Sequence, residues 1–109
     1  MTEPLRLGIA GLGTVGAGVV RIVQTHAAML EARGGRPVAI AAVCARSRNR
    51  DRGVDLSGYD WEDDPVALAR RDDVDVLIEL MGGEDGPAKA CVEAALETGK
   101  HVVTANKAM

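Results

Sequence analysis

The sequence predicts an α/β fold in which one parallel sheet is covered by helices on both faces, giving a doubly wound domain of three layers. Short apolar runs of strand length alternate along the chain with longer segments of helical periodicity. The apolar runs contain almost no polar residues, as expected of strands that helices cover on both sides. Phe is absent and the only aromatic residues are Tyr59 and Trp61, so aliphatic side chains must supply nearly all of the core.

The first pair of elements is a strand followed by a helix. Apolar residues run from Leu5 to Ala10 and stop at the glycine-rich segment 11–16, which indicates a strand and a tight turn. The next segment has three- and four-residue apolar spacing, which predicts a helix ending near Gly34-Gly35. A lone histidine on such a helix is usually a satisfied residue at the core edge, so no function is assigned to it. The expected buried stripe consists of Val15, Val19, Ile22, Val23, His26 and Leu30.

A second strand and a short helix follow. Residues 38–44 are almost free of polar groups and are predicted to form a strand inside the sheet. Residues 45–58 are polar and Arg-rich without a clear period, which predicts a loop, and residues 59–61 are expected to add a short edge strand. Asp64-Pro65 combines an N-cap residue with proline at the first helical position, so a short helix is expected from there through Arg71.

The remaining sequence predicts strand, helix and strand. Residues 74–81 form an apolar run that ends at Gly82-Gly83, and residues 101–105 form another. Pro87 begins a helix between them, and Gly99 occupies the position of a C-terminal cap. This alternation predicts a parallel sheet with right-handed crossovers. The expected buried stripe of the helix consists of Ala88, Cys91, Val92, Ala95 and Leu96.

Length and charge limit the functions that the chain can perform. A chain of 109 residues suffices for one compact domain, so residues 1–109 are expected to form a single unit. The net charge of -3 gives no overall attraction for nucleic acid or anionic lipid, and neither is an expected partner. The first ten residues match neither a signal peptide nor a membrane span of about 20 apolar residues, which predicts a cytoplasmic protein. Cys44 and Cys91 lack metal or redox spacing, so no metal is expected and both are predicted to be reduced core residues.

The glycine-rich segment between the first strand and helix has the form G-x-G-x-x-G. In this context Gly11 permits the tight turn, Gly13 lets the backbone approach a pyrophosphate, and Gly16 allows close packing of helix on strand. The start of the helix, near Thr14 and Val15, offers N–H groups and a partial positive charge to the phosphates. A glycine-rich turn without a ligand is the alternative. The order of strand, motif, helix and second strand favours a Rossmann-type domain that binds a nicotinamide dinucleotide.

The end of the second strand indicates which dinucleotide is bound. NAD-specific domains usually place an acid there to accept hydrogen bonds from the ribose 2'-hydroxyl, but no Asp or Glu occurs in residues 32–50. The sequence instead has Arg46 and Ser47, whose guanidinium and hydroxyl groups suit a 2'-phosphate. This predicts NADP as the cofactor, with Arg46 the favoured ligand, while NAD remains possible. The alternative is a solvated loop in which the arginines have no ligand.

The carboxyl ends of the later strands should face the nicotinamide half of the cofactor. Met81 ends one of these strands and Gly82-Gly83 follows it, with Gly82 leaving space for the cofactor. A plain loop would explain each of these two glycines equally well. Glu79 is an acid within an apolar strand, and it either anchors a neighbouring loop or faces a solvated edge. Lys107 follows the last strand, where an amine could polarise a carbonyl or relay a proton. Spacing alone favours an ordinary exposed lysine at that position.

Four segments of the sequence carry a specific pattern, namely GLGTVG at 11–16, ARS at 45–47, IELMGG at 78–83 and VTANKA at 103–108. Taken together, they resemble the homoserine dehydrogenase family in order and spacing. The resemblance spans the whole chain, and the TANKA segment is its most specific part. It implies reversible hydride transfer between NAD(P)H and aspartate semialdehyde, giving homoserine on the route to threonine and methionine. It also implies that Lys107 is catalytic beside the nicotinamide and that the backbone around Thr104 lines the cofactor.

The resemblance further implies a dimerising substrate domain, with a second catalytic lysine, that would follow residue 109. The chain is therefore expected to be a cofactor domain truncated before the substrate domain, able to bind nucleotide but inactive alone, and the full-length enzyme is expected to be a homo-oligomer. One alternative is the nucleotide domain of a related oxidoreductase, such as an aspartate dehydrogenase or a sugar oxidoreductase, although the TANKA segment argues against it. A stand-alone module that senses NAD(P)H is the other alternative.

Overall fold

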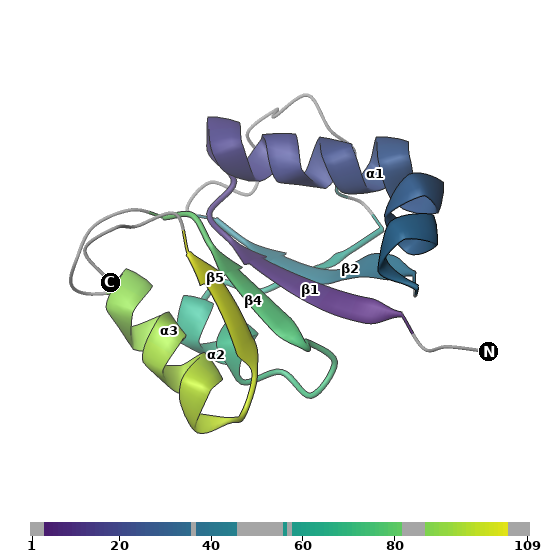
Figure 1. The fold of residues 1–109 in the computed structure, drawn as a ribbon. Coiled ribbons are helices and arrows are strands. Elements are labelled where there is room, and N and C mark those ends of the chain that lie inside the picture. Colours follow the sequence, from purple (N-terminus) through teal and green to yellow (C-terminus); the bar gives the residue numbers. More distant parts are fainter. Residues whose placement is uncertain (1–3, 36, 46–55, 57, 82–86, 105–109) are drawn as a thin grey trace.

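The computed structural model describes residues 4–35, 37–45, 56, 58–81 and 87–104 (Figure 1). Their strands form one parallel sheet in the order β3-β2-β1-β4-β5. The predicted parallel sheet is confirmed, and so is the short edge strand. The strands are β1 (Leu5–Ala10), β2 (Val38–Cys44), β3 (Asp60–Trp61), β4 (Val76–Glu79) and β5 (His101–Thr104).

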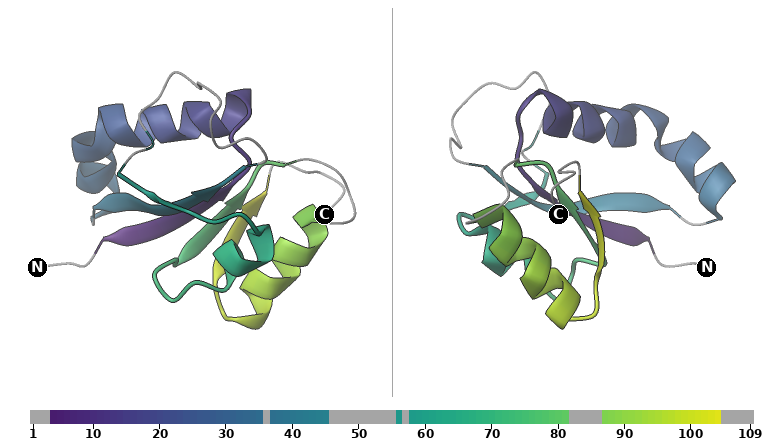
Figure 2. Two further views of the ribbon diagram at one scale, coloured as in Figure 1. Left: turned by 180° about the vertical axis from the view of Figure 1, so that it is seen from behind. Right: turned by 60° about the vertical axis from the view of Figure 1, so that its left-hand side comes forward.

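Helices cover both faces of this sheet and make the three predicted layers. Helix α1 (Thr14–Gly34) lies on one face, while α2 (Pro65–Ala69) and α3 (Pro87–Glu97) lie side by side on the other (Figures 1 and 2). The fold is therefore the Rossmann-type α/β arrangement that the sequence predicts. Among the described helices, none combines the length and apolar character needed to cross a bilayer.

The core has two parts, one on each face of the sheet, and an irregularity between β1 and β2 determines how β2 contributes to both. Leu7 pairs with Ile40 but Gly8 pairs with Ala42, so β2 contains one extra residue at this point. As a result Ile40 and Val43, three positions apart, both pack on the α1 side. The core beneath α2 and α3 consists of Ala10, Ala42, Cys44, Leu68, Ala69, Leu77, Cys91, Ala94 and Ala95.

Local capping interactions explain where several elements begin and end. The Asp64 carboxylate accepts a hydrogen bond from the Val66 N–H at 3.0 Å and caps α2, with Pro65 at the start of the helix as predicted. Gly99 follows α3 with a φ of 77°, and the Lys100 N–H donates to the Ala95 carbonyl at 2.9 Å. These bonds satisfy backbone groups that the helix ends leave unpaired.

The buried face of α1 differs from the predicted stripe. Val15 and Ile22 are 62% and 52% exposed, and His26 is also exposed. His26 has non-helical backbone angles (φ -118°, ψ 25°), and the helix bends there (Figure 1). The prediction is therefore wrong at Val15, Ile22 and His26, because Gly16 packs tightly on the Gly11 carbonyl and so faces the sheet in place of Val15. It is confirmed at Val23, which is buried, and at Val19, which packs against the core, while the side chain of Leu30 lies outside the described part. Among the α1 residues whose side chains the structure describes, the buried ones are Gly16, Ala17, Val20 and Val23.

Three further predictions differ from the structure in detail. Leu96 of α3 is 62% exposed, because the helix turns Ala94 toward the core in its place, next to Ala95, which is buried as predicted. The short helix α2 ends at Ala69 rather than Arg71. The strand expected over residues 74–81 covers only Val76–Glu79, because the chain turns beyond Glu79 and the Met81 N–H bonds to the Glu79 side chain.

Candidate dinucleotide-binding site

The carboxyl end of β1 leads into a turn that only glycine fits. Gly11 has a φ of 101°, in the left-handed region that residues with a Cβ rarely adopt. A Cβ there would also lie 3.0 Å from the backbone carbonyl carbon of Leu80 and the amide nitrogen of Met81. The Gly11 N–H donates to the Cys44 carbonyl at the end of β2, over 2.8 Å. The turn is therefore held between the ends of β2 and β4.

The two other glycines of the motif have opposite surroundings. A Cβ on Gly16 would overlap the carbonyl oxygen of Gly11, so this position lets α1 pack directly on the turn. At Gly13, by contrast, no atom of the described residues beyond its own neighbours in the chain lies within 4 Å of the place that a Cβ would occupy. Gly13 is the N-cap of α1 and has no side chain to cap it, and the first turn holds no acidic residue. The amide groups at the start of α1 thus border an open region suited to an anion.

A buried carboxylate joins the ends of β4 and β5. Glu79 is the last residue of β4, pairs with Ala10 of β1 and Thr104 of β5 in the sheet register, and is fully buried. Its Oε2 accepts a hydrogen bond from the Met81 N–H at 2.6 Å, and its Oε1 accepts one from the Thr104 hydroxyl at 2.7 Å. Of the two roles that the sequence left open for Glu79, the structure shows that it anchors a neighbouring loop.

The two cysteines lie behind this edge of the sheet and have free, buried thiols, as predicted. Burial, together with nearby Asp64, Asp63 and Glu62, raises the pKa of Cys44 to about 11. Burial, with Glu79 and Cys44 nearby, raises the pKa of Cys91 to about 12. Both thiols therefore remain protonated at neutral pH and are poor nucleophiles. Within the described part of the chain, no three His, Cys, Asp or Glu residues group so as to hold a metal ion.

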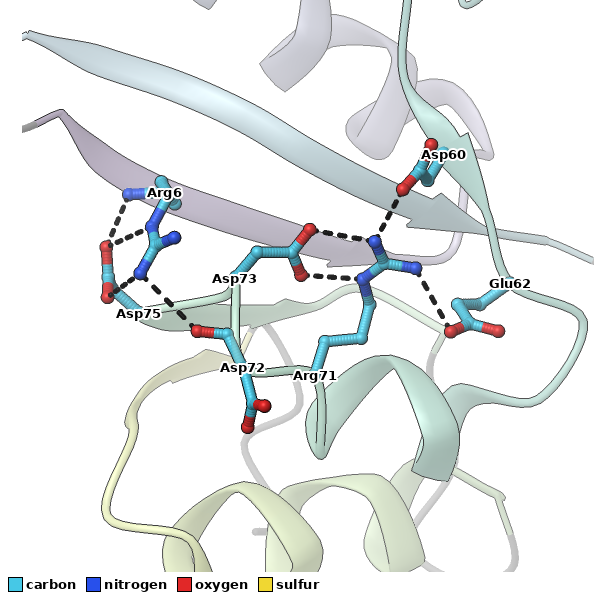
Figure 3. A network of polar contacts seen from close by, with 7 residues as sticks. All are labelled: Arg6, Asp60, Glu62, Arg71, Asp72, Asp73 and Asp75. Carbon is cyan, nitrogen blue, oxygen red and sulfur yellow. Dashed lines mark hydrogen bonds and ion pairs between the residues drawn. The ribbon is translucent and has the colours of Figure 1, made fainter.

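Among the residues that the structure describes, the largest group of interacting charges lies elsewhere, between β3 and the connection from α2 to β4 (Figure 3). The Arg71 guanidinium contacts Asp60 at 2.6 Å, Asp73 at 2.7 Å and Glu62 at 3.1 Å. The hydrogen bond from Arg71 holds the pKa of Asp73 below its usual value, and the Asp73 carboxylate in turn contributes most to raising the pKa of Arg71. This Arg71 network, consisting of Arg71, Asp60, Glu62 and Asp73, ties an edge strand to its neighbours.

The structure places several sequence-predicted site residues at one edge of the sheet. Gly11, Gly13, Val15 and Gly16 form the turn and the start of α1, while Met81 and Thr104 meet through Glu79. Sequence reasoning singled out Glu79 but gave it no place in the site, and an acid at the last position of a buried strand was the available signal. The remaining predicted residues lie outside the described part of the chain, namely Arg46, Ser47, Gly82 and Lys107, as does the side chain of Thr14.

Comparison with protein families gives one consistent result. A family model described as the NAD binding domain of homoserine dehydrogenase matches residues 11–109. Homoserine dehydrogenase of Neisseria gonorrhoeae is 43% identical over 105 residues, covering 96% of this chain and 24% of that protein. The Bacillus subtilis enzyme is 44% identical over 112 residues, covering 96% of this chain and 24% of that protein. The chain thus spans about a quarter of the length of the curated relatives it matches.

Solved structures agree with the sequence relatives. Homoserine dehydrogenase of S. aureus, in a crystal structure at pH 7.0, superposes with a TM-score of 0.87 at 30% identity, covering 100% of this chain and 28% of that one. The enzyme of Thiobacillus denitrificans superposes with a TM-score of 0.86 at 32% identity, covering 96% of this chain and 24% of that one. The fold of the whole described chain therefore corresponds to part of these enzymes.

Proposed function

The chain belongs to the homoserine dehydrogenase family, as its NAD-binding domain, and on this premise we propose that it binds NADP(H) for the interconversion of aspartate semialdehyde and homoserine. The observation that carries the proposal is the glycine turn. Gly11 and Gly16 pack against each other, while Gly13 faces open space at the start of α1. That arrangement leaves room for a pyrophosphate on the helix N-terminus, where N–H groups and the helix dipole stabilise negative charge.

The preference for NADP over NAD rests on the residues that follow β2. The Cys44 carbonyl accepts the Gly11 N–H, so β2 ends directly beside the proposed pyrophosphate position. Arg46 and Ser47 come two and three residues later, close along the chain to where the adenosine ribose would lie. We propose that the Arg46 guanidinium and Ser47 hydroxyl bind the 2'-phosphate, since arginine presents fixed donors that suit phosphate oxygens.

The nicotinamide end is assigned to the ends of β4 and β5. Met81 and Gly82 follow β4, and Lys107 comes three residues after Thr104, the last residue of β5. We propose that Lys107 polarises the substrate carbonyl and relays a proton to or from its oxygen. The nicotinamide supplies or accepts the hydride. Thr14 and Val15 contact the phosphates, and Thr104 lines the cofactor through its backbone.

The proposal for the whole enzyme extends beyond this chain. Because the chain covers about a quarter of its relatives, we propose that turnover requires the part of those proteins that it does not match. That part would supply the substrate pocket and the contacts between subunits of a homo-oligomer. Residues 1–109 alone would bind nucleotide without catalysis. We place the activity in the cytoplasm, in threonine and methionine biosynthesis.

The test is a calorimetric titration of the chain with NADP and with NAD, repeated for Arg46→Ala. The unsubstituted chain is expected to bind NADP about tenfold or more tighter than NAD, as the loss of charged hydrogen bonds implies. Arg46→Ala should remove most of that difference by weakening NADP alone. Arg33→Ala, at the far end of α1, also removes one positive charge and should leave the ratio of NADP affinity to NAD affinity unchanged. Folded protein that binds neither nucleotide at millimolar concentration would disprove the cofactor assignment.

A further inference from the structure

The buried carboxylate of Glu79 has a position that folding alone does not explain. Leu77, two residues earlier on the same side of β4, is apolar and fully buried, and so is Ala10, which pairs with Glu79 across the sheet. An apolar residue at position 79 would fit the same surroundings. Burying a carboxylate is costly unless each oxygen finds a donor, and a well-packed apolar replacement is usually at least as stable. The acid therefore calls for a reason beyond core packing.

The reason lies in the two groups that hydrogen-bond to the Glu79 carboxylate oxygens. One accepts from the Met81 backbone N–H and the other from the Thr104 hydroxyl, so a single side chain connects residues that follow or end two different strands. Both residues lie at the carboxyl edge of the sheet, where ligands of doubly wound folds bind. The Met81 amide also lies against Gly11, within 3.0 Å of the place that a Cβ would occupy. Glu79 thus links the glycine turn to the end of β5.

We propose that Glu79 is a positioning residue for the nicotinamide half of the cofactor. It sets the end of β5 at a fixed distance from the pyrophosphate turn, so that both halves of one dinucleotide fit at once. This rests on the proposed function, because it assumes that the glycine turn binds the pyrophosphate. Glu79 makes no contact with the reacting atoms in this assignment. Its effect passes through Met81 and Thr104.

The positioning role predicts a selective loss that a purely structural role would not produce. The two ligands to compare are NADPH and 2'-phospho-ADP-ribose, which is the same molecule without nicotinamide. Thr104→Val removes the hydroxyl that bonds to Glu79 and keeps the shape of the side chain. It should raise the dissociation constant of NADPH about tenfold, as expected when one hydrogen bond to a charged group is lost, and change that of 2'-phospho-ADP-ribose by no more than about threefold. Thr104→Ser keeps a hydroxyl and should restore the original ratio of the two dissociation constants.

Variants at Glu79 separate its geometry from its charge. In Glu79→Gln the amide can still accept from the Met81 N–H and can donate to Thr104, so the ratio of the two dissociation constants should stay within about threefold of the original. Glu79→Ala breaks both bonds and should change the ratio at least as much as Thr104→Val. Thr98→Val is the matched control, because its hydroxyl donates to the Ala94 and Ala95 carbonyls at the end of α3. Thr98 precedes the start of β5, whereas Thr104 is the last residue of that strand.

Each of the following results would overturn the proposal. Equal weakening of both ligands in Thr104→Val, or a loss of thermal stability with an unchanged ratio, would make the bond merely structural. A Glu79→Gln variant that behaves like Glu79→Ala would show that charge, not position, is what matters. If the unsubstituted chain binds neither ligand, the proposed function itself fails and the positioning role falls with it. If it binds both and the ratio never changes, the function stands and only the role of Glu79 is wrong.

Discussion

Two polar clusters in this domain satisfy a charged side chain in different ways. Glu79 is fully buried and is held by one backbone N–H and one hydroxyl, both neutral dipoles. Arg71 keeps 19% of its side chain exposed and is held by three carboxylates, of which Asp60 is 69% exposed. Water and salt screen the second cluster and cannot reach the first. Glu79 is thus held by dipoles in the interior, at the carboxyl edge of the sheet, whereas Arg71 is held by countercharges near the surface and fastens an edge strand.

The largest effect on stability and on nucleotide binding is expected from Gly16→Ala, at the glycine turn. Its Cβ would overlap the Gly11 carbonyl oxygen, so the turn or the helix must move. We expect a loss of about 3 kcal/mol in the free energy of unfolding, at the upper end for overpacking, and loss of NADPH binding in protein that remains folded. Urea unfolding and calorimetric titration measure the two effects.

Gly18→Ala is the control for this change, since Gly18 lies in the same helix and, apart from the nearby helix backbone, no atom of the described part of the chain lies within 4 Å of its Cβ position. Alanine there should raise stability by up to about 1 kcal/mol, because glycine is a poor helix residue. If both variants lost similar stability, the close contact at Gly16 would not be the cause.

The stability that the Arg71 network contributes should depend on pH. Arg71→Met leaves three carboxylates without their shared cation, and we expect it to lower the free energy of unfolding by about 1 to 2 kcal/mol at pH 7, reduced by solvent screening. The folded-state pKa of Asp73 is lowered, so its contribution is present above the ordinary Asp pKa of about 3.9 and is lost as pH falls through the folded value. The penalty should therefore shrink once the pH falls below about 4.

Unfolding by urea at pH 7 and pH 3 checks this prediction, with Arg70→Met as the matched variant. Arg70 forms one ion pair with Glu97, in which both side chains are more than half exposed. Its substitution should change stability by less than about 0.5 kcal/mol at either pH. A penalty for Arg71→Met that stayed constant with pH would mean that packing, not charge, stabilises this edge.

The smallest effect on stability is expected at Asp64, and it tests whether the Arg71 network and the nucleotide site are independent. Asp64 caps α2, which leads directly into the Arg71 network, through one hydrogen bond to the Val66 N–H. Asp64→Ala should lower stability by about 1 kcal/mol, while Asp64→Asn should keep most of the cap. Neither change should alter nucleotide affinity. Thermal unfolding compared with titration of NADPH would show a functional link between the regions if affinity fell as well.

The elements that the sequence predicted well are those marked by local chemistry. Asp64-Pro65 begins α2, Gly99 ends α3, and the glycine motif separates β1 from α1, because each acts through neighbouring backbone atoms. The exposed positions of Val15 and Ile22 could not be predicted in this way. Apolar residues occur on more than one side of α1, and the contact that selects its buried side is made with the turn, not within the helix.

The role of Glu79 was harder still to predict. Its partner Thr104 lies 25 residues away and meets it only because β4 and β5 pair in one particular register. Nothing in the spacing of residues along the chain specifies that register. The sequence could thus indicate that the carboxyl edge binds a dinucleotide, while the way in which the loops at that edge are held together required the three-dimensional arrangement.

The bend at His26 has a consequence for how the domain tolerates changes in length. The attraction of a helix terminus for an anion is confined to its first turn, so the part of α1 beyond the bend contributes little to it. Beyond the bend, Met29 is 45% exposed and residues 31–35 are exposed as well. Insertions or a grafted tag should therefore be accepted between Glu31 and Gly35, making this segment a suitable place to attach a reporter without disturbing the nucleotide site.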